Sequence, residues 1–365
     1  MLFFLERNVV QVKFVDRTFN ADPRRALEIL TFIHKNDTGI TNFHFEIVAS
    51  LLDESTMTFL ENVRPGLFQF EIGVQTTHDE TMVAIDRNIN FVTLSDRVKR
   101  LSSYKNIHLH LDLIAGLPFE SFDIFLNSFE EVYQLKPEML QLGFLKVLKG
   151  SGLRINKEKY GYVFSNYAPY EIFYNAYISY EELSVLKDVE EMVETYFNNF
   201  RFRNSLAMII TRHYNRAVDF YLDLGRYFRE KGYFDQPLKA SFMYEVLLAF
   251  YVEKFNEDKE GFTAILKYDY YLNFKKPLPL FEDENDKNFK NICYDLLKEK
   301  RIFSEEDLSP KLWLKRLAFV KFDRNIYDMI KSGFKKTEKE HMVVAFDYET
   351  KKENPTDYNV THHFN

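Results

Sequence analysis

The chain reads LFQFEIGV over residues 67–74 and IHLHLDLIAG over residues 107–116, and these two stretches decide the fold. Each is a short apolar run with aliphatic and aromatic residues, which is typical of a buried strand. Further runs of this kind lie at residues 9–16, 42–48 and 139–148, and helical patterns separate the runs. Strands that alternate with helices at this spacing predict consecutive βαβ units and a parallel sheet.

The segments between the runs carry helix-boundary signals. Asp22 and Pro23 read as an N-cap followed by a first-turn proline. Asp53 can cap the next helix, and Thr77 and Glu80 have the spacing of a capping box. Five strands are too few to close an eight-stranded barrel. We therefore predict an α/β fold with a partial parallel (β/α) barrel, whose first strand, at residues 9–16, has an uncovered edge.

The pattern changes after about residue 155. Long helical stripes follow at residues 170–199, 203–231 and 240–255, and short strands are indicated at residues 268–274, 317–323 and 342–348. We predict two domains: an incomplete barrel at residues 1–155, and a mainly α-helical C-terminal domain with a few short strands at residues 156–365.

Charge and hydropathy argue against a nucleic-acid-binding protein and against a membrane-spanning protein. The 365 residues carry 55 acidic and 48 basic side chains, which give a formal net charge of −7. This balance argues against a nucleic-acid surface, because phosphate binding depends on clustered Lys and Arg. No apolar run reaches the roughly 20 residues that span a membrane. We expect a cytoplasmic protein without a nucleic-acid or membrane partner.

The cysteine count restricts the chemistry most strongly. Cys293 is the one cysteine in the sequence, which excludes an internal disulfide, a thiolate zinc site and a cysteine-ligated cluster within one chain. We interpret it as a small buried hydrophobic residue. The histidines of the strands lack the carboxylate spacing of motifs such as His-Glu-x-x-His. We therefore predict no metal site in this chain.

Acidic residues recur late in four of the runs, at Asp16, Glu46, Glu71 and Asp112. Parallel barrels place their active sites at the carboxyl ends of the strands. Alternate strand residues face the same side, so His44 shares a face with Glu46, and His110 shares a face with Asp112. A polar-lined interior implies a wet cavity for a sizeable ligand. The alternative is that these carboxylates cap helices or pair with Arg17, Arg87 and Lys146.

Several motifs, in order, resemble the radical S-adenosylmethionine (radical SAM) superfamily: VKFVDRTFN (residues 12–20), HFEI (44–47), FEIGVQT (70–76) with AIDRN (84–88), and HLDLIAGLP (110–118). They look like the second to fifth strands of that barrel, closest to the branch of anaerobic coproporphyrinogen oxidase and the cobalamin-dependent enzymes. LKGSGLR (148–154) and APYEIF (168–173) resemble a helical domain of unknown function that follows the barrel in one such group.

The resemblance implies roles for named residues. Glu46 would hold the amino-acid end of S-adenosylmethionine, and Gln75 and Arg87 would contact its carboxylate or ribose. Asp112 would accept hydrogen bonds from the ribose hydroxyls, and Ile114 and Gly116 would lie beside the adenine. The remaining implied positions are Glu71 in the same cofactor set and, as candidate pocket-lining residues, Asp16, Arg17, Asn20, His44 and His110.

The departure from the family is equally informative. The family holds its [4Fe-4S] cluster with a Cys-x-x-x-Cys-x-x-Cys loop after the first strand, and the chain contains neither. We expect a C-terminal fragment that is inactive as given, since the cofactors carry the radical chemistry. The parent enzyme would use S-adenosylmethionine, the cluster, an electron donor or reductase and an unknown small-molecule substrate, with cobalamin in a preceding domain. The catalytic residues stay unknown.

Two other hypotheses remain open. A natural cluster-free relative would serve as a binding or scaffold protein. A cluster-independent barrel enzyme would use the strand carboxylates for acid–base work. The uncovered edge of the first strand also makes self-association a candidate partner interaction.

Overall fold

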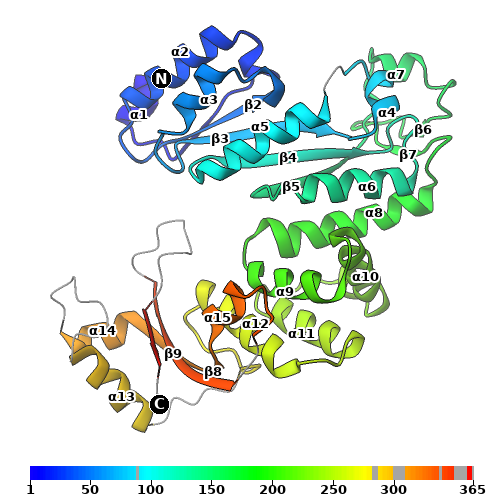
Figure 1. Ribbon diagram of the computed structural model, residues 1–365. Coiled ribbons are helices and arrows are strands. Elements are labelled where there is room, and N and C mark those ends of the chain that lie inside the picture. The colour runs from blue at the N-terminus through cyan, green and yellow to red at the C-terminus, as the bar shows by residue number, and fades with distance from the viewer. Residues whose placement is uncertain (88–89, 282–286, 299–308, 337–338, 349–359, 364–365) are drawn as a thin grey trace. The chain divides into compact units, whose positions relative to one another are not determined.

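The computed structural model describes the chain except for residues 88–89, 282–286, 299–308, 337–338, 349–359 and 364–365 (Figure 1). The chain divides into two compact units. Unit 1 contains Met1–Asn198 and Arg216–Gly225, and unit 2 contains Asn199–Asn215 and Arg226–Asn365. The sequence division near residue 155 stays a prediction.

A five-stranded parallel sheet forms the centre of unit 1, in the order β1-β2-β3-β4-β5. Each strand coincides with one of the apolar runs that were predicted to form strands, and β3 extends one residue beyond its run, to Gln75. The predicted fold class, an α/β fold built on a partial parallel barrel, is therefore confirmed. The strands are β1 (Gln11–Lys13), β2 (Asn42–Ile47), β3 (Phe68–Gln75), β4 (His108–Ala115) and β5 (Met139–Phe144).

Helices connect these strands. Asp22 caps α2 by accepting from two backbone amides, and Asp53 caps α3, as the sequence indicated. The capping box predicted at Thr77 is wrong: α4 has His78 at its N-cap, with no side-chain cap, because the Thr77 hydroxyl donates to Ser128 instead. The elements are α1 (Leu2–Glu6), η1 (Phe19–Ala21), α2 (Pro23–Lys35), η2 (Ala49–Leu51), α3 (Glu54–Leu60), α4 (Asp79–Ala84), α5 (Phe91–Tyr104) and α6 (Phe122–Tyr133).

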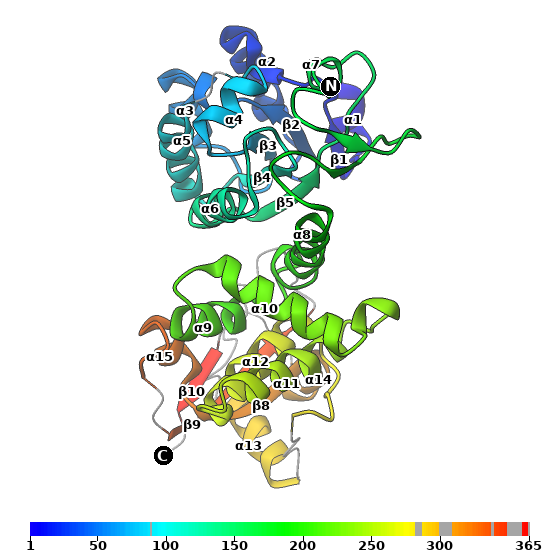
Figure 2. The same ribbon diagram turned by 90° about the vertical axis from the view of Figure 1, so that its right-hand side faces the viewer.

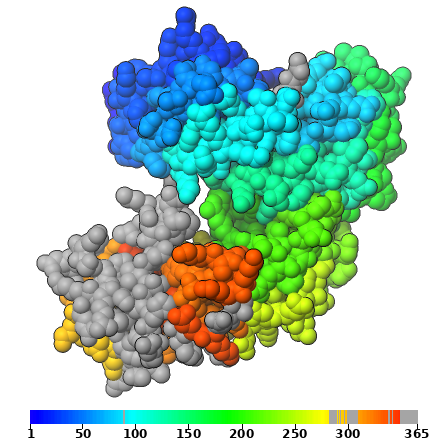
Figure 3. Space-filling view, in the orientation of Figure 1, coloured from blue at the N-terminus to red at the C-terminus, as the bar shows by residue number. Residues whose placement is uncertain are grey.

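The two faces of the sheet differ sharply. Phe43, Phe45, Phe70, Leu111 and Leu113 alternate with the polar residues and are fully or almost fully buried. Helices α3, α5 and α6 lie on one side of the sheet (Figure 2), and Figure 3 shows the outer surface of the N-terminal elements in blue and cyan. Burial of such a side chain stabilises the fold by about 1.5–3 kcal/mol. The helices therefore cover the apolar face and leave the opposite face for polar groups.

Strand β1 forms an edge of the sheet, as predicted, and pairs with β2 alone among the described strands. The valines that flank it, Val10 and Val15, are 72% and 89% exposed. Exposed apolar residues beside unpaired backbone groups favour pairing with another strand. Self-association through this edge stays a prediction.

The chain after β5 differs in detail from the single helix predicted at residues 170–199. A short antiparallel pair comes first, and α8 begins only at Tyr180, where Ser179 and Glu182 form a capping box. The predicted helix at residues 203–231 is likewise two helices. The elements are α7 (Gly152–Ile155), β6 (Val163–Phe164), β7 (Ile172–Tyr174), α8 (Tyr180–Met192), η3 (Val193–Asn198), α9 (Arg203–His213) and α10 (Ala217–Glu230).

Unit 2 is helical with one antiparallel sheet, in the order β10-β9-β8. The strands predicted near residues 317–323 and 342–348 are present as β8 and β9. The strand predicted at residues 268–274 is wrong, because Asp258 caps a helix that runs through it and buries Tyr268 and Tyr271 at helical spacing. The elements are η4 (Tyr233–Asp235), α11 (Phe242–Lys254), α12 (Lys259–Asn273), α13 (Lys287–Lys298), α14 (Pro310–Arg316), β8 (Leu317–Arg324), α15 (Ile326–Lys331), β9 (Lys339–Asp347) and β10 (Val360–His363).

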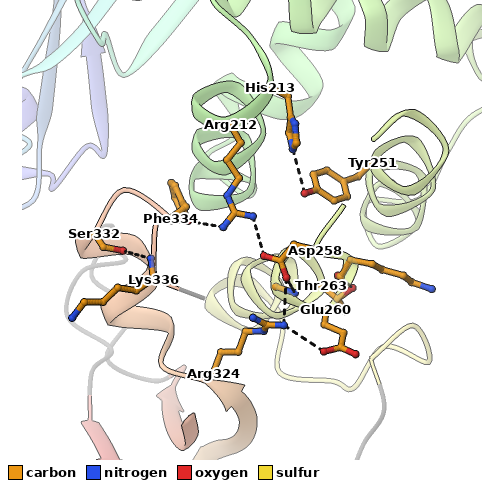
Figure 4. Close-up of polar contacts among 12 residues, drawn as sticks. Arg212, His213, Tyr251, Asp258, Glu260, Thr263, Arg324, Ser332, Phe334 and Lys336 are labelled. Atoms are coloured by element: carbon orange, nitrogen blue, oxygen red, sulfur yellow. Dashed lines mark hydrogen bonds and ion pairs between the residues drawn. The ribbon is translucent and has the colours of Figure 1, made fainter. Parts of the chain in front are cut away.

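Asp258 joins several elements of unit 2 (Figure 4). Its carboxylate lies 2.9 Å from Arg212 of α9 and 3.3 Å from Arg324 of β8, and it accepts from the backbone amide of Gly261. The Arg324 side chain is only 8% exposed. Removal of the carboxylate would leave a buried guanidinium without its main counter-charge, which is costly.

We predict that Asp258→Ala destabilises unit 2 by about 2–3 kcal/mol, through the lost cap and the loss of the carboxylate that pairs with both Arg212 and Arg324. Chemical denaturation, with hydrogen exchange in α12 and β8, measures the loss. Glu260→Ala is the matched control, because Glu260 also contacts Arg324 but its side chain is 65% exposed; it should cost about 0.5 kcal/mol or less. Equal losses of stability in Asp258→Ala and Glu260→Ala contradict the structural role assigned to Asp258.

Candidate functional site

The polar residues of unit 1 lie in rows across the uncovered face of the sheet. Strand register places Glu46 beside Glu71, and Glu71 beside His110. The next row toward the carboxyl ends places Asp112 beside Gly73 and Gln141. The structure thus brings the predicted carboxylates and histidines of three adjacent strands onto one surface.

An ion-pair cluster lies around Glu71, on the amino-terminal side of the Asp112 row. Lys13 Nζ lies 3.0 Å from Glu71 Oε2 and 3.6 Å from Glu46 Oε1. His44 Nε2 lies 3.0 Å from the same Glu71 oxygen. Sequence reasoning missed Lys13, although its alternation with Gln11 on β1 places it on the polar face.

The charges of this cluster follow from burial and pairing. Burial alone would raise the pKa of Glu71, but the hydrogen bond and charge of Lys13 outweigh it and lower that pKa. Burial lowers the pKa of His44, assisted by the charge of Lys13, and burial also lowers the pKa of His110. Both shifts favour the neutral imidazole over the imidazolium form.

Asp112 is a buried carboxylate of the polar face with unused hydrogen-bonding capacity. Gln75 Nε2 donates to its Oδ2 at 2.7 Å. Its Oδ1 is buried and has no hydrogen-bond partner in the part of the chain that the structure describes. Burial, followed by the negative charge of Glu71, raises the pKa of Asp112 to about 7. A buried acceptor without a donor is costly unless a ligand supplies one.

Gly73 and Arg87 complete this row. Arg87 Nη1 donates to the Gly73 carbonyl at 3.1 Å, and its charge lies close enough to Asp112 to lower that pKa in part. A Cβ atom on Gly73 would lie 2.7 Å from Gln75 Nε2 and 3.2 Å from Arg87 Nη1. Only glycine leaves room for both side chains. Asn88, the last residue of the AIDRN motif, lies outside the described residues.

The row at the carboxyl end is apolar. Ile114 is partly exposed and lies beside Gly143 in the register, so its side chain has no neighbouring Cβ on β5. Gly116 follows with φ of 90°, and the Ile172 methyl groups would lie 3.0–3.1 Å from a Cβ there. Asn175 donates to the Gly116 carbonyl. Ile114 therefore offers a small apolar platform, while Gly116 packs against the β6–β7 segment.

The other pocket candidates lie apart from this cluster. Asp16 and Arg17 are exposed in the segment after β1. Asn20 is buried, and both its amide nitrogen and its amide oxygen bond the backbone of Val48, each at 2.9 Å. Asn20 therefore holds the end of β2, and pocket roles for these residues stay predictions.

The iron–sulfur cluster does not fit the residues of this chain. Cys293, the single cysteine, is buried beside Phe289 and Val343 in unit 2. Burial raises the pKa of its thiol to about 12, so it stays protonated and is a poor metal ligand. Among the described residues, no group of three or more His, Cys, Asp or Glu side chains is arranged to hold a metal ion.

We predict that Gly73→Ala displaces the Gln75 amide from Asp112, because the new methyl group would lie 2.7 Å from Gln75 Nε2. The loss of stability should be small, about 0.5–1.5 kcal/mol, because the atoms that the methyl group meets are the ends of flexible side chains that can change rotamer. Denaturant unfolding and the side-chain amide resonances of Gln75 measure both effects. Gly143→Ala is the control, since the nearest atom to its Cβ would lie 3.5 Å away. Gln75 amide resonances that are the same in Gly73→Ala and in wild type contradict the geometry.

These features define the class of protein: an α/β half barrel, with helices on the apolar face of a parallel sheet and a cluster of polar side chains on the opposite face. Residues 158–346, more than half of the chain, match the family described as "Protein of unknown function (DUF4080)". The chain therefore belongs to the DUF4080 family. No curated protein matches the chain. Among the described residues, no helix is long and apolar enough to cross a membrane.

Solved structures of radical SAM enzymes are similar to this chain. The methyltransferase TsrM from Kitasatospora setae, with cobalamin and a [4Fe-4S] cluster bound, aligns with 14% identity and a TM-score of 0.40 over 47% of this chain and 36% of that chain. Coproporphyrinogen III oxidase (HemN) from Escherichia coli aligns with 16% identity and a TM-score of 0.31 over 38% of this chain and 32% of that one.

A third similar structure is OxsB, described as a cobalamin-dependent S-adenosylmethionine radical enzyme. It aligns with 10% identity and a TM-score of 0.38 over 79% of this chain and 42% of that chain. The aligned region is thus well under half the length of each of these three solved chains.

Proposed function

We propose that the polar face of unit 1 binds S-adenosylmethionine, and that the chain contributes this site to a radical SAM enzyme acting on an unknown small-molecule substrate. The observation that carries the proposal is the buried Asp112 carboxylate, whose Oδ1 has no donor among the described residues while Gln75 holds its Oδ2. A ribose supplies adjacent hydroxyl donors, which is what such a carboxylate requires.

Each residue has a binding or orienting task. Asp112 accepts from the ribose, and Gln75 fixes the Asp112 rotamer through the 2.7 Å hydrogen bond. Arg87 supplies a guanidinium for the methionyl carboxylate. Glu46, whose side chain is 36% exposed, accepts from the ammonium group. Ile114 packs against the adenine ring.

When bound, S-adenosylmethionine supplies a sulfonium whose one-electron reduction gives the 5′-deoxyadenosyl radical. This chain cannot supply the cluster for that reduction, because a single buried thiol does not replace three cysteine ligands. We assign the cluster, its electron donor and any cobalamin site to polypeptide outside these 365 residues. The residues described above bind and orient S-adenosylmethionine; none of them is assigned a redox step.

A second candidate function rests on the same cysteine count. A cluster-free relative would bind the nucleoside and act as a binding or scaffold protein. One measurement separates the two candidates. The chain is joined in frame to a Cys-x-x-x-Cys-x-x-Cys segment, iron and sulfide are added anaerobically, and the formation of 5′-deoxyadenosine is measured. Product favours the enzyme, and binding without product favours the scaffold.

We predict that the chain binds adenosine with a Kd of roughly 0.1–1 mM, as expected for a small ligand with few polar contacts. Hydroxyl donors prefer the ionised form of Asp112, whose pKa is about 7. Affinity should therefore rise between pH 6 and pH 8 and level off above it. Isothermal titration calorimetry with adenosine, which has no titrating group in this range, measures the profile.

Asp112→Asn should bind roughly tenfold more weakly, without the pH dependence, because the neutral amide loses the charge-assisted bonds. Asp53→Asn is the control, since Asp53 caps α3 away from the polar face and Asn caps equally well. The same affinity and pH profile in wild type and Asp112→Asn would remove the support for the proposal.

A further inference from the structure

Glu120 is a buried carboxyl group that none of the assignments above uses. It lies in the turn between β4 and α6 and is 1% exposed. Its Oε1 accepts from the hydroxyl of Thr76, which directly follows β3, and from the Ser128 hydroxyl of α6 at 3.3 Å. Its Oε2 is buried and has no hydrogen-bond partner among the described residues. Glu120 thus connects the carboxyl ends of the two central strands that carry Gln75 and Asp112.

Thr76, which donates to Glu120, directly follows Gln75, whose backbone conformation is strained. Gln75 has φ of 70°, in the left-handed region that non-glycine residues rarely adopt, and the β3–β4 register shifts between Gly73 and Gln75. This conformation costs roughly 1–2 kcal/mol, so neighbouring contacts must hold it. Gln75 itself bonds Asp112, and Thr76, the next residue, is fully buried and donates its hydroxyl to Glu120.

The same hydroxyl network continues toward Arg87. The Thr76 hydroxyl accepts from the His78 backbone amide at 3.1 Å, and Ser128 accepts from the Thr77 amide at 3.2 Å. Thr81 of α4 donates to the Pro118 carbonyl at 2.8 Å. These bonds fix the segment that begins at Gln75, passes through α4 and ends at Arg87.

We propose that Glu120 is a positioning residue for the nucleoside site: by bonding Thr76 and Ser128 it holds Gln75 in the left-handed conformation that directs its amide to Asp112. The inference rests on the proposed function for the identity of the ligand, whereas the role of Glu120 in holding Gln75 does not depend on it. It is distinct from the residues that would touch the nucleoside, because Glu120 acts on them through Thr76.

The surroundings of Glu120 favour a neutral carboxyl group. Burial raises its pKa to about 7, although the Thr76 and Ser128 hydroxyls oppose the rise. Tyr162 is the titratable side chain that faces it from the β6 side; burial, with smaller effects of Tyr160, Tyr177 and Glu120, raises the Tyr162 pKa, so Tyr162 stays protonated. On the α4 side, the His78 ring contacts Thr81. A neutral carboxyl group resembles an amide, so glutamine is the conservative substitute.

The test uses two matched pairs of variants of the full chain. Glu120→Gln keeps an acceptor for Thr76, and Glu120→Ala removes it. Thr76→Ser keeps the donor, and Thr76→Val keeps the shape alone. The readouts are the Gln75 side-chain amide resonances, hydrogen exchange of residues 75–78, and the Kd for adenosine.

We expect Glu120→Gln and Thr76→Ser to behave as wild type in all readouts. Glu120→Ala and Thr76→Val should shift the Gln75 resonances, speed exchange of residues 75–78, and weaken adenosine binding roughly tenfold. Thr76→Val adds no cavity. If Glu120→Ala fails to fold, Thr76→Val therefore still tests whether the hydroxyl bond to Glu120 holds Gln75. Gln75 resonances and exchange unchanged in Thr76→Val overturn the assignment.

The outcomes also separate this inference from the proposed function. The resonance and exchange measurements need no ligand. Absence of adenosine binding in wild type counts against the proposed function, while loss of the Gln75 geometry in Thr76→Val still supports the role of Glu120.

Discussion

The hydrogen bond from Gln75 to Asp112 connects strands β3 and β4 of unit 1 near their carboxyl ends, on the polar face of the sheet. It depends on three local conditions: a glycine at position 73, a left-handed backbone at Gln75, and burial of the Asp112 carboxyl group. Each condition costs stability in isolation. Their combination in one row of the sheet is the arrangement expected where a ligand, rather than the fold, uses the polar groups.

The sheet supports this arrangement through strict alternation. Every second strand residue is apolar and buried beneath α3, α5 and α6, so a one-residue slip would expose the whole core. The same register aligns Glu46, Glu71 and His110, and then Gly73 and Asp112. The stability of the apolar face thus determines the geometry of the polar face.

Sequence reasoning predicted the strands, their parallel order and the shared face of the carboxylates, because these depend on periodicity and on motif order. It missed Lys13 and Glu120. Lys13 pairs across strands with Glu71, and Glu120 bonds Thr76 from 44 positions away, so neither contact has a local pattern. The strand predicted at residues 268–274 failed for a related reason: a short aromatic window does not reveal a helix that begins at Lys259.

The central claim is that the unpartnered Asp112 oxygen faces a nucleoside. A crystal structure of the chain soaked with S-adenosylmethionine tests it most directly. We expect a ribose hydroxyl within hydrogen-bond distance of Asp112 Oδ1, with Gln75 still bonded to the other carboxylate oxygen. Nucleoside density elsewhere, or an Asp112 side chain turned away from Gln75 toward solvent, would contradict the account.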